Sequence, residues 1–211
     1  MTNEWESLEE RELNNYSYKV KVSLLNEPIK FWHNYERIIF LGDSLTDFCE
    51  WHEFDIPNRI KIYNRGISGD TCSGIMARID SIRKLYPAKL FLMAGINNLA
   101  VSQPVYIASK EYQKLIAEIT SFLDGDKVFL LSILPINPDM YHNKHIPNNY
   151  NIIRLNEEIK RIAKEFHCGY IDLYNEMIDE NGYLKIEYTV DGCHLNSCGY
   201  RVWYSKLTKL L

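Results

Sequence analysis

The 211-residue sequence has no apolar run long enough to cross a membrane, since no segment approaches about 18 consecutive apolar residues. It also has no excess of basic residues: 24 lysines and arginines stand against 28 aspartates and glutamates, a net charge of −4. Because contacts to phosphates need a basic face, nucleic acid is not expected as a partner. The acidic first residues 1–6 show no basic-then-apolar pattern, so we expect no signal peptide and a cytoplasmic location.

Cysteine and nucleotide motifs are also scarce. The five cysteines are an odd number and form no Cys-x-x-Cys pair, which argues for reduced thiols over a disulfide framework or a zinc site. Neither Gly-x-Gly-x-x-Gly nor a Gly-Lys-Ser/Thr phosphate loop occurs, so a nucleotide site is poorly supported. We expect no cofactor and no metal. No internal repeat, low-complexity tract or Gly/Ser linker divides the chain, and its length suits a single domain.

The chain does contain short β-rich apolar runs that alternate with helical patterns. The runs are Arg37–Leu41, Ile60–Asn64, Lys89–Ala94, Lys127–Ile133 and Gly169–Leu173. Helical spacing is found over Ser73–Leu85, Pro104–Leu123, Asn149–Phe166 and about Ser197–Leu211. This alternation predicts an α/β fold with three layers, αβα, around a five-stranded parallel sheet.

Residues 1–35 precede the first predicted strand and carry none of the turns described below. Leu8, Leu13 and Tyr16 could line a helix, whereas Tyr18 to Leu24 alternate apolar and polar side chains as a strand does. We expect a helix followed by an extended lead-in. This segment would pack on the domain formed by residues 36–211, or on a second subunit if the protein forms a homo-oligomer.

Polar, glycine-rich turns follow the first three predicted strands. They are Gly42-Asp43-Ser44, Asn64–Asp70 and Gly95–Asn98. In a parallel α/β sheet, functional groups gather beyond the carboxyl ends of the strands. Each turn alone is a weak signal, but together they predict a site at one edge of the sheet.

A serine, an aspartate and a histidine give that site a candidate reaction. A serine hydroxyl becomes a good nucleophile when an imidazole takes its proton and a carboxylate fixes the imidazole tautomer. Ser44 follows a buried strand, and Asp191 and His194 lie before the closing helix. We predict these three as nucleophile, orienting acid and general base. The alternatives are an N-cap serine, an Asp-Gly turn and a surface histidine.

Three donors are candidates for stabilising an oxyanion. They are the backbone N–H groups of Ser44 and Gly69 and the side-chain amide of Asn97. Donors fixed in advance toward a developing negative charge are worth about 3 kcal/mol each. Glycine lets its N–H approach closely because it has no Cβ.

Two further segments are expected to overhang the same edge. Trp51, in the turn after Ser44, is predicted to bind substrate, and the proline- and asparagine-rich loop 135–149 is a possible flap. His142 and His145 in that loop are read as solvent-facing, since no third metal ligand is evident.

The four separated blocks resemble those of the SGNH (GDSL) hydrolase superfamily. They are Gly42-Asp43-Ser44-Leu45, residues 64–70, Gly95-Ile96-Asn97-Asn98 and Asp191-Gly192-Cys193-His194-Leu195. The resemblance covers about residues 36–211 and implies a flavodoxin-like fold and metal-free ester hydrolysis through an acyl-serine intermediate. Residues 1–35 resemble the N-terminal extension of bacterial acylhydrolases and acetyl esterases.

Two positions differ from the family or vary within it. The third block more often ends in Asp, and Asn98 stands there in this chain. We therefore expect altered local hydrogen bonding but retained activity. Cys193 is expected to be a small buried residue and not a second nucleophile.

Three functions stay open at this point. The first is a serine esterase that cleaves short-chain or acetyl esters of small molecules. The second is a lysophospholipase- or thioesterase-type lipid acylhydrolase with the same chemistry. The third is a binding protein on the same fold that has lost catalysis, since fold alone does not prove function.

Overall fold

The computed structural model describes residues 8–25, 34–142 and 147–211. Five parallel strands form one sheet in the order β2-β1-β3-β4-β5. The strands are β1 Glu36–Gly42, β2 Ile60–Gly66, β3 Lys89–Met93, β4 Val128–Leu131 and β5 Gly169–Ile171. The predicted α/β class and the five-stranded parallel sheet are thus confirmed.

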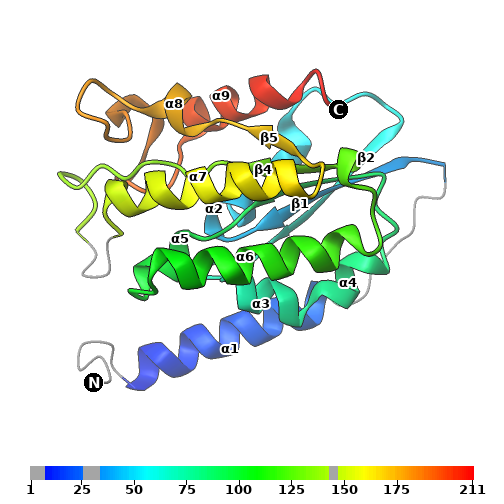
Figure 1. Cartoon of the computed structure of the whole chain (residues 1–211), viewed down its shortest axis with the longest axis horizontal. Helices are drawn as coiled ribbons and strands as arrows, with labels where there is room; N and C mark the ends of the chain where they lie inside the picture. Colours follow the sequence, from blue (N-terminus) through cyan, green and yellow to red (C-terminus); the bar gives the residue numbers. More distant parts are fainter. Residues whose placement is uncertain (1–7, 26–33, 143–146) are drawn as a thin grey trace.

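Helices cover both faces of this sheet. They are α1 Leu8–Leu25, α2 Ser44–Asp47, α3 Cys72–Ala77, α4 Ile79–Arg83, α5 Ile96–Ala100, α6 Val105–Thr120, α7 Asn149–Glu165, α8 Tyr174–Met177 and α9 Ser197–Leu207. Short 3₁₀ turns occur at Trp51–Glu53, Gly125–Lys127 and Ile186–Tyr188. Figure 1 shows α6 and α7 side by side across one face, with α1 lying outside α3. In the described part of the chain, no helix has the length and apolar character that crossing a bilayer requires.

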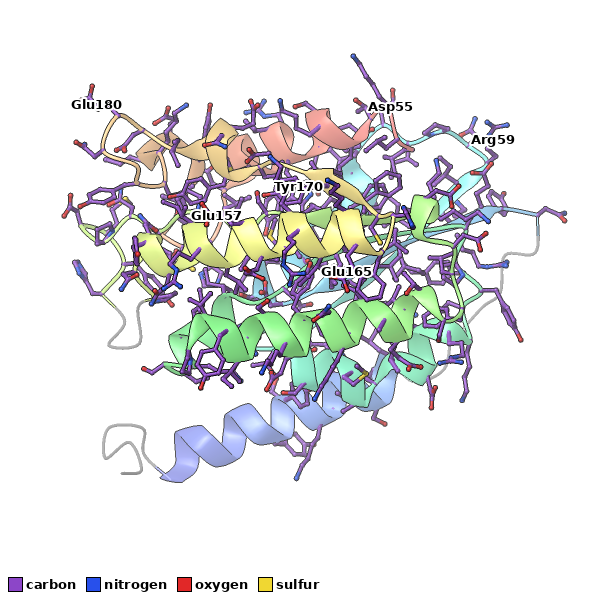
Figure 2. The ribbon with its side chains drawn as sticks, in the orientation of Figure 1. Asp55, Arg59, Glu157, Glu165, Tyr170 and Glu180 are labelled. Carbon is purple, nitrogen blue, oxygen red and sulfur yellow. The ribbon has the colours of Figure 1, made fainter. Side chains whose placement is uncertain are left out.

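Alternation along the strands builds two cores, one on each face. On β1, Ile39 and Leu41 join the core beneath α3, α6 and α7, whereas Ile38 and Phe40 join the core beneath α9. Successive strand side chains point to opposite faces, so apolar residues at every position of a strand fill both layers. The outer side of α7 carries charge instead, including Glu157 and Glu165 (Figure 2).

Two predicted elements differ from the structure. The predicted helix 73–85 is divided into α3 and α4 at Arg78, whose side chain turns inward to Asp70. The extended lead-in is wrong for residues 18–25, which continue α1. The helix is held by Tyr18 and Lys21, which contact the domain one helical turn apart. The prediction of a domain over 36–211 remains a prediction, and part of residues 1–35 lies outside the described residues.

Candidate active site

Ser44 follows the carboxyl end of β1, where Gly42 lets β1 approach the neighbouring strand β3 closely. A Cβ on Gly42 would lie 2.3 Å from the carbonyl oxygen of Met93 on β3, so only glycine fits there. Asp43 then caps α2, its Oδ1 accepting from the N–H of Leu45 at 3.1 Å. Ser44 is therefore the first residue of α2 and not its N-cap, and it is 8% exposed.

The serine, histidine and aspartate meet although 150 residues separate Ser44 from His194. Ser44 Oγ lies 3.0 Å from His194 Nε2, and His194 Nδ1 lies 2.7 Å from Asp191 Oδ2. The second carboxylate oxygen, Asp191 Oδ1, accepts from the backbone N–H groups of Cys193 at 2.9 Å and His194 at 2.7 Å. The carboxylate thus holds the imidazole through both its ring and its backbone, with the other ring nitrogen directed at Ser44.

The loop that carries Asp191 and His194 is fixed from two sides. Thr189 Oγ1 donates to the carbonyl of His194 at 2.7 Å and accepts from the N–H of Gly192 at 2.9 Å. Gly192 has a φ of +90°, and an added Cβ would lie 2.6 Å from the carbonyl oxygen of Asn137. The N–H of Asn137 donates to the carbonyl of Gly192 at 2.8 Å. The described part of loop 135–149 therefore supports the Asp191–His194 loop, a role that we did not predict.

Hydrogen bonds keep the carboxylate of Asp191 ionised. Partial burial raises its pKa, but the bonds from the His194 ring and from the backbone N–H groups of His194 and Cys193 outweigh this effect. The pKa of Asp191 consequently lies below its ordinary value. An ionised carboxylate beside Nδ1 favours the tautomer in which Nε2 is free to accept a proton from Ser44.

The three predicted oxyanion donors follow the carboxyl ends of three neighbouring strands, β1, β2 and β3. The backbone N–H groups of Ser44 and Gly69 donate to no acceptor in the described part of the chain. Gly69 has a φ of +77°, which a glycine adopts without strain. Asn97, one residue into α5, donates one Nδ2 hydrogen to the carbonyl of Asp70 at 2.9 Å, which leaves its second hydrogen for a ligand.

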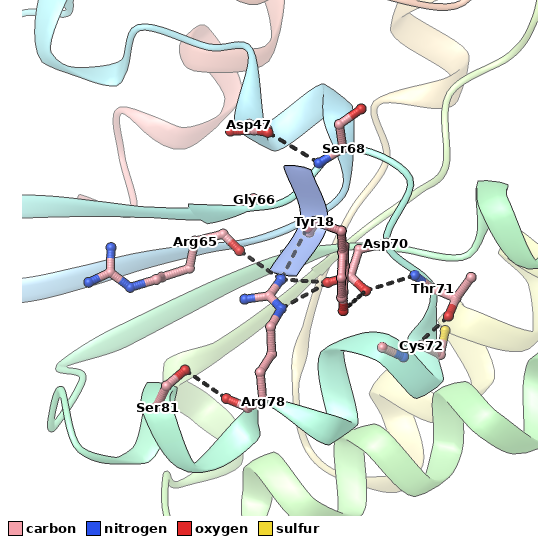
Figure 3. A network of polar contacts seen from close by, with 12 residues as sticks. Tyr18, Asp47, Arg65, Gly66, Ser68, Asp70, Thr71, Cys72, Arg78 and Ser81 are labelled. Carbon is pink, nitrogen blue, oxygen red and sulfur yellow. Dashed lines mark hydrogen bonds and ion pairs between the residues drawn. The ribbon is translucent and has the colours of Figure 1, made fainter. Parts of the chain in front are cut away.

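A buried ion pair behind this turn was not predicted from the sequence. Asp70 and Arg78 lie 2.8 Å apart with side chains 1% and 2% exposed, and Arg78 also donates to the carbonyl of Arg65 at 2.9 Å (Figure 3). Burial raises the pKa of Asp70, and the nearby guanidinium of Arg78 opposes that rise. The signal available in the sequence was an unexplained arginine inside an apolar helical pattern.

The two atypical positions have clear environments. Asn98 is 2% exposed, accepts from the N–H of Cys72 at 3.1 Å, and donates to Gln103 Oε1 at 2.7 Å and Glu111 Oε2 at 2.9 Å. Cys193 is 7% exposed, and burial raises the pKa of its thiol to about 12. A thiol with so high a pKa carries almost no thiolate at neutral pH.

Trp51 does not lie where a substrate could reach it, and this corrects its predicted role. Its side chain is 3% exposed, stacks on Phe40 with ring centroids 4.0 Å apart, and donates from Nε1 to the carbonyl of Thr46. The aromatic residue beside the histidine is instead Phe48, which is 53% exposed, with its ring centroid 5.2 Å from that of His194.

The histidines of loop 135–149 give no support to a metal site. His142 is exposed, and His145 lies outside the described residues. Within the described ranges, no group of three or more His, Cys, Asp or Glu side chains is arranged to hold a metal ion.

A three-layer α/β fold with a serine, a histidine and a carboxylate aligned at its strand ends is typical of serine hydrolases. Comparison with known families agrees: residues 40–202 match the GDSL-like lipase/acylhydrolase family. The chain belongs to this family.

Solved structures share the fold at low sequence identity. A Streptococcus pneumoniae protein provisionally described as a platelet activating factor superposes with a TM-score of 0.83 at 24% identity, covering 95% of each chain. An acetylxylan esterase from Geobacillus stearothermophilus gives a TM-score of 0.62 at 16% identity, over 82% of this chain and 93% of that one. At such identities the likeness concerns the fold.

A curated relative is much longer than this chain. The N-acylneuraminate cytidylyltransferase of Escherichia coli O18:K1:H7 is 26% identical over 191 residues, which are 89% of this chain but 43% of the relative. The chain thus spans less than half of that protein, and the name cytidylyltransferase refers to the full-length relative.

Proposed function

We propose that the chain is a serine esterase that cleaves short-chain carboxylic esters, acetyl esters above all, through an acyl-serine intermediate. The observation that carries the proposal is the continuous hydrogen-bonded line from Ser44 Oγ through His194 to Asp191, with separations of 3.0 and 2.7 Å. These distances lie within reach of direct proton transfer.

In the proposed acylation step, Ser44 Oγ attacks the ester carbonyl carbon while His194 Nε2 takes the hydroxyl proton. The carbonyl oxygen becomes an oxyanion that accepts from the N–H groups of Ser44 and Gly69 and from Asn97 Nδ2. The tetrahedral intermediate then expels the alcohol, which receives the proton from His194. Asp191 stays ionised throughout and stabilises the imidazolium.

In the proposed deacylation step, water takes the place of the alcohol. His194 removes a proton from that water as it attacks the acyl-Ser44 carbonyl, and the same donors hold the second oxyanion. Collapse of this intermediate breaks the bond to Ser44 Oγ, and the proton on His194 returns to the serine. The acid is released and the enzyme is restored.

The preference for short acyl groups is supported by the surroundings of Ser44. Its side chain is largely buried, and the ring of Phe48 stands beside His194. The fold likeness to an acetylxylan esterase is consistent with acetyl groups on a polar scaffold.

The test is a panel of p-nitrophenyl acetate, butyrate and octanoate together with acetylated sugars. We expect a burst of p-nitrophenol equal to the enzyme concentration, and kcat/KM that falls with acyl length. Ser44→Ala should abolish the burst, whereas Ser121→Ala, at an exposed position at the end of α6, should keep it. Full activity of Ser44→Ala would refute the proposed mechanism, and rising activity toward octanoate would favour a lipid acylhydrolase.

A further inference from the structure

The N-terminal helix α1 is connected to both neighbours of Gly69, directly to Asp70 and through Asp47 to Ser68. Tyr18 Oη donates to Asp70 Oδ1 at 3.2 Å (Figure 3). Lys21 Nζ lies 2.6 Å from Asp47 Oδ1, and Asp47 Oδ2 accepts from the N–H of Ser68 at 3.1 Å. Tyr18 and Lys21 are one helical turn apart, so a single face of α1 contacts the turn after β2 directly at Asp70 and indirectly, through Asp47, at Ser68.

Gly69 itself makes few contacts, so its position is fixed mainly by its neighbours Ser68 and Asp70. It is exposed, its φ is +77°, and an added Cβ would find no atom within 4 Å. The direction of its N–H therefore depends on how Ser68 and Asp70 are fixed. A donor aimed at an oxyanion contributes most when it is held before the reaction begins.

Asp70 connects α1 to a second oxyanion donor. Its backbone carbonyl accepts from Asn97 Nδ2 at 2.9 Å, so a shift of Asp70 would move this amide as well. Its carboxylate Oδ2 is bound by Arg78, and its Oδ1 accepts from the N–H of Thr71 and from Tyr18. Both contacts of α1 thus act on the turn that supplies the Gly69 donor, and the contact to Asp70 also reaches the Asn97 donor through the Asp70 carbonyl.

We propose that α1 is a positioning element of the oxyanion hole, acting through Tyr18 on Asp70 and through Lys21 and Asp47 on Ser68. The proposal rests on the esterase function above. Both residues lie outside residues 40–202, the part of the chain that matches the family. Tyr18 should have the larger effect, because the Lys21 side chain is 41% exposed and solvent therefore screens its ion pair with Asp47.

The test compares Tyr18→Phe with Tyr16→Phe. Both changes remove one hydroxyl from α1, but Tyr16 is 67% exposed. For p-nitrophenyl acetate we expect kcat of Tyr18→Phe to fall about tenfold, with KM within about twofold of the wild type, as for a misplaced catalytic donor. Tyr16→Phe should match the wild type, and thermal unfolding should show that each variant is folded.

A double-variant cycle separates positioning from general damage. If Tyr18 acts through the oxyanion hole, its removal in an Asn97→Ala background should lower kcat by only about threefold, because one of the two donors that it helps to position is already gone. Equal losses in both backgrounds, or unchanged kcat in Tyr18→Phe, would overturn the proposal. If Tyr18→Phe does not fold, Lys21→Met is measured in the wild-type background: a lower kcat with KM within about twofold supports the proposal, and an unchanged kcat overturns it.

These results also distinguish this proposal from the esterase function. If the wild-type protein gave no burst of p-nitrophenol, the esterase function itself would be refuted. A normal wild-type burst that needs Ser44, combined with an unaffected Tyr18→Phe variant, would refute only the role of α1.

Discussion

Asn98 on α5 donates a hydrogen bond of 2.9 Å to the carboxylate of Glu111 on α6. An amide suits this place because its Nδ2 group also donates to Gln103, while its Oδ1 accepts from Cys72. An aspartate, more usual in the family, would set two carboxylates face to face. The presence of Asn98 in place of an aspartate is thus explained by the neighbouring carboxylate of Glu111, which needs a donor.

Asn98→Asp is therefore expected to destabilise the fold by about 2–3 kcal/mol at pH 7, since a buried carboxylate would lose two donated bonds and meet a like charge. Urea unfolding measures this loss. The second change Glu111→Gln should restore most of the stability by removing the repulsion. A double variant no more stable than Asn98→Asp alone would contradict this explanation.

Asp43 makes stability depend on pH. Burial raises the pKa of Asp43 to about 7, and the hydrogen bond from the N–H of Leu45 only partly opposes this rise. Asp43 Oδ2 has no hydrogen-bond partner among the described residues. The folded state therefore keeps a proton that the unfolded chain releases near pH 4, so this group lowers stability as the pH rises from about 4 to 7.

Asp43→Asn should remove that loss while keeping an acceptor for the N–H of Leu45. Relative to the wild type, the variant should gain up to about 4 kcal/mol between pH 4 and pH 7, the free energy of a pKa shift of about three units. Urea unfolding at several pH values provides the measurement. Parallel stability profiles for the two proteins would show that the carboxyl is not desolvated.

Trp51→Phe should affect stability and not substrate binding. The indole is buried against Phe40, and its Nε1 bonds to the carbonyl of Thr46. Loss of this packing and this bond is expected to cost about 1–3 kcal/mol, with KM for p-nitrophenyl acetate unchanged within about twofold. Thermal unfolding and steady-state kinetics measure the two effects.

Phe48→Ala is the matched comparison in the same segment. Its exposed ring lies beside His194, so its removal should raise KM about fivefold, as expected for roughly 1 kcal/mol of lost apolar contact, and leave the unfolding temperature nearly unchanged. If Trp51→Phe raised KM and Phe48→Ala did not, the sequence-based assignment of Trp51 would stand.

Much of this architecture could be predicted from local patterns. The five apolar runs are buried on both faces, so they read as continuous strands, and the rule that sites form at carboxyl strand ends placed Ser44, Gly69 and Asn97 together. The spacing of Asp191 and His194 allowed the carboxylate to reach the ring because Gly192 turns the chain between them.

The remaining features depend on contacts between distant residues. Tyr18 to Leu24 alternate as a strand does, yet Val20 and Leu24 are exposed on a helix that is held by Asp70 and Asp47. Trp51 gives no local sign of its burial, since the Phe40 ring that it stacks on comes from β1. Such pairings exist only after the sheet has formed.

The most direct measurement of the central claim is the site of covalent labelling by an organophosphonate, located by peptide mass spectrometry. The account predicts one adduct, on Ser44, with a labelling rate that falls at least about a hundredfold in His194→Ala because the serine loses its base. An adduct on another residue, or labelling of Ser44 at an equal rate without the imidazole, would contradict it.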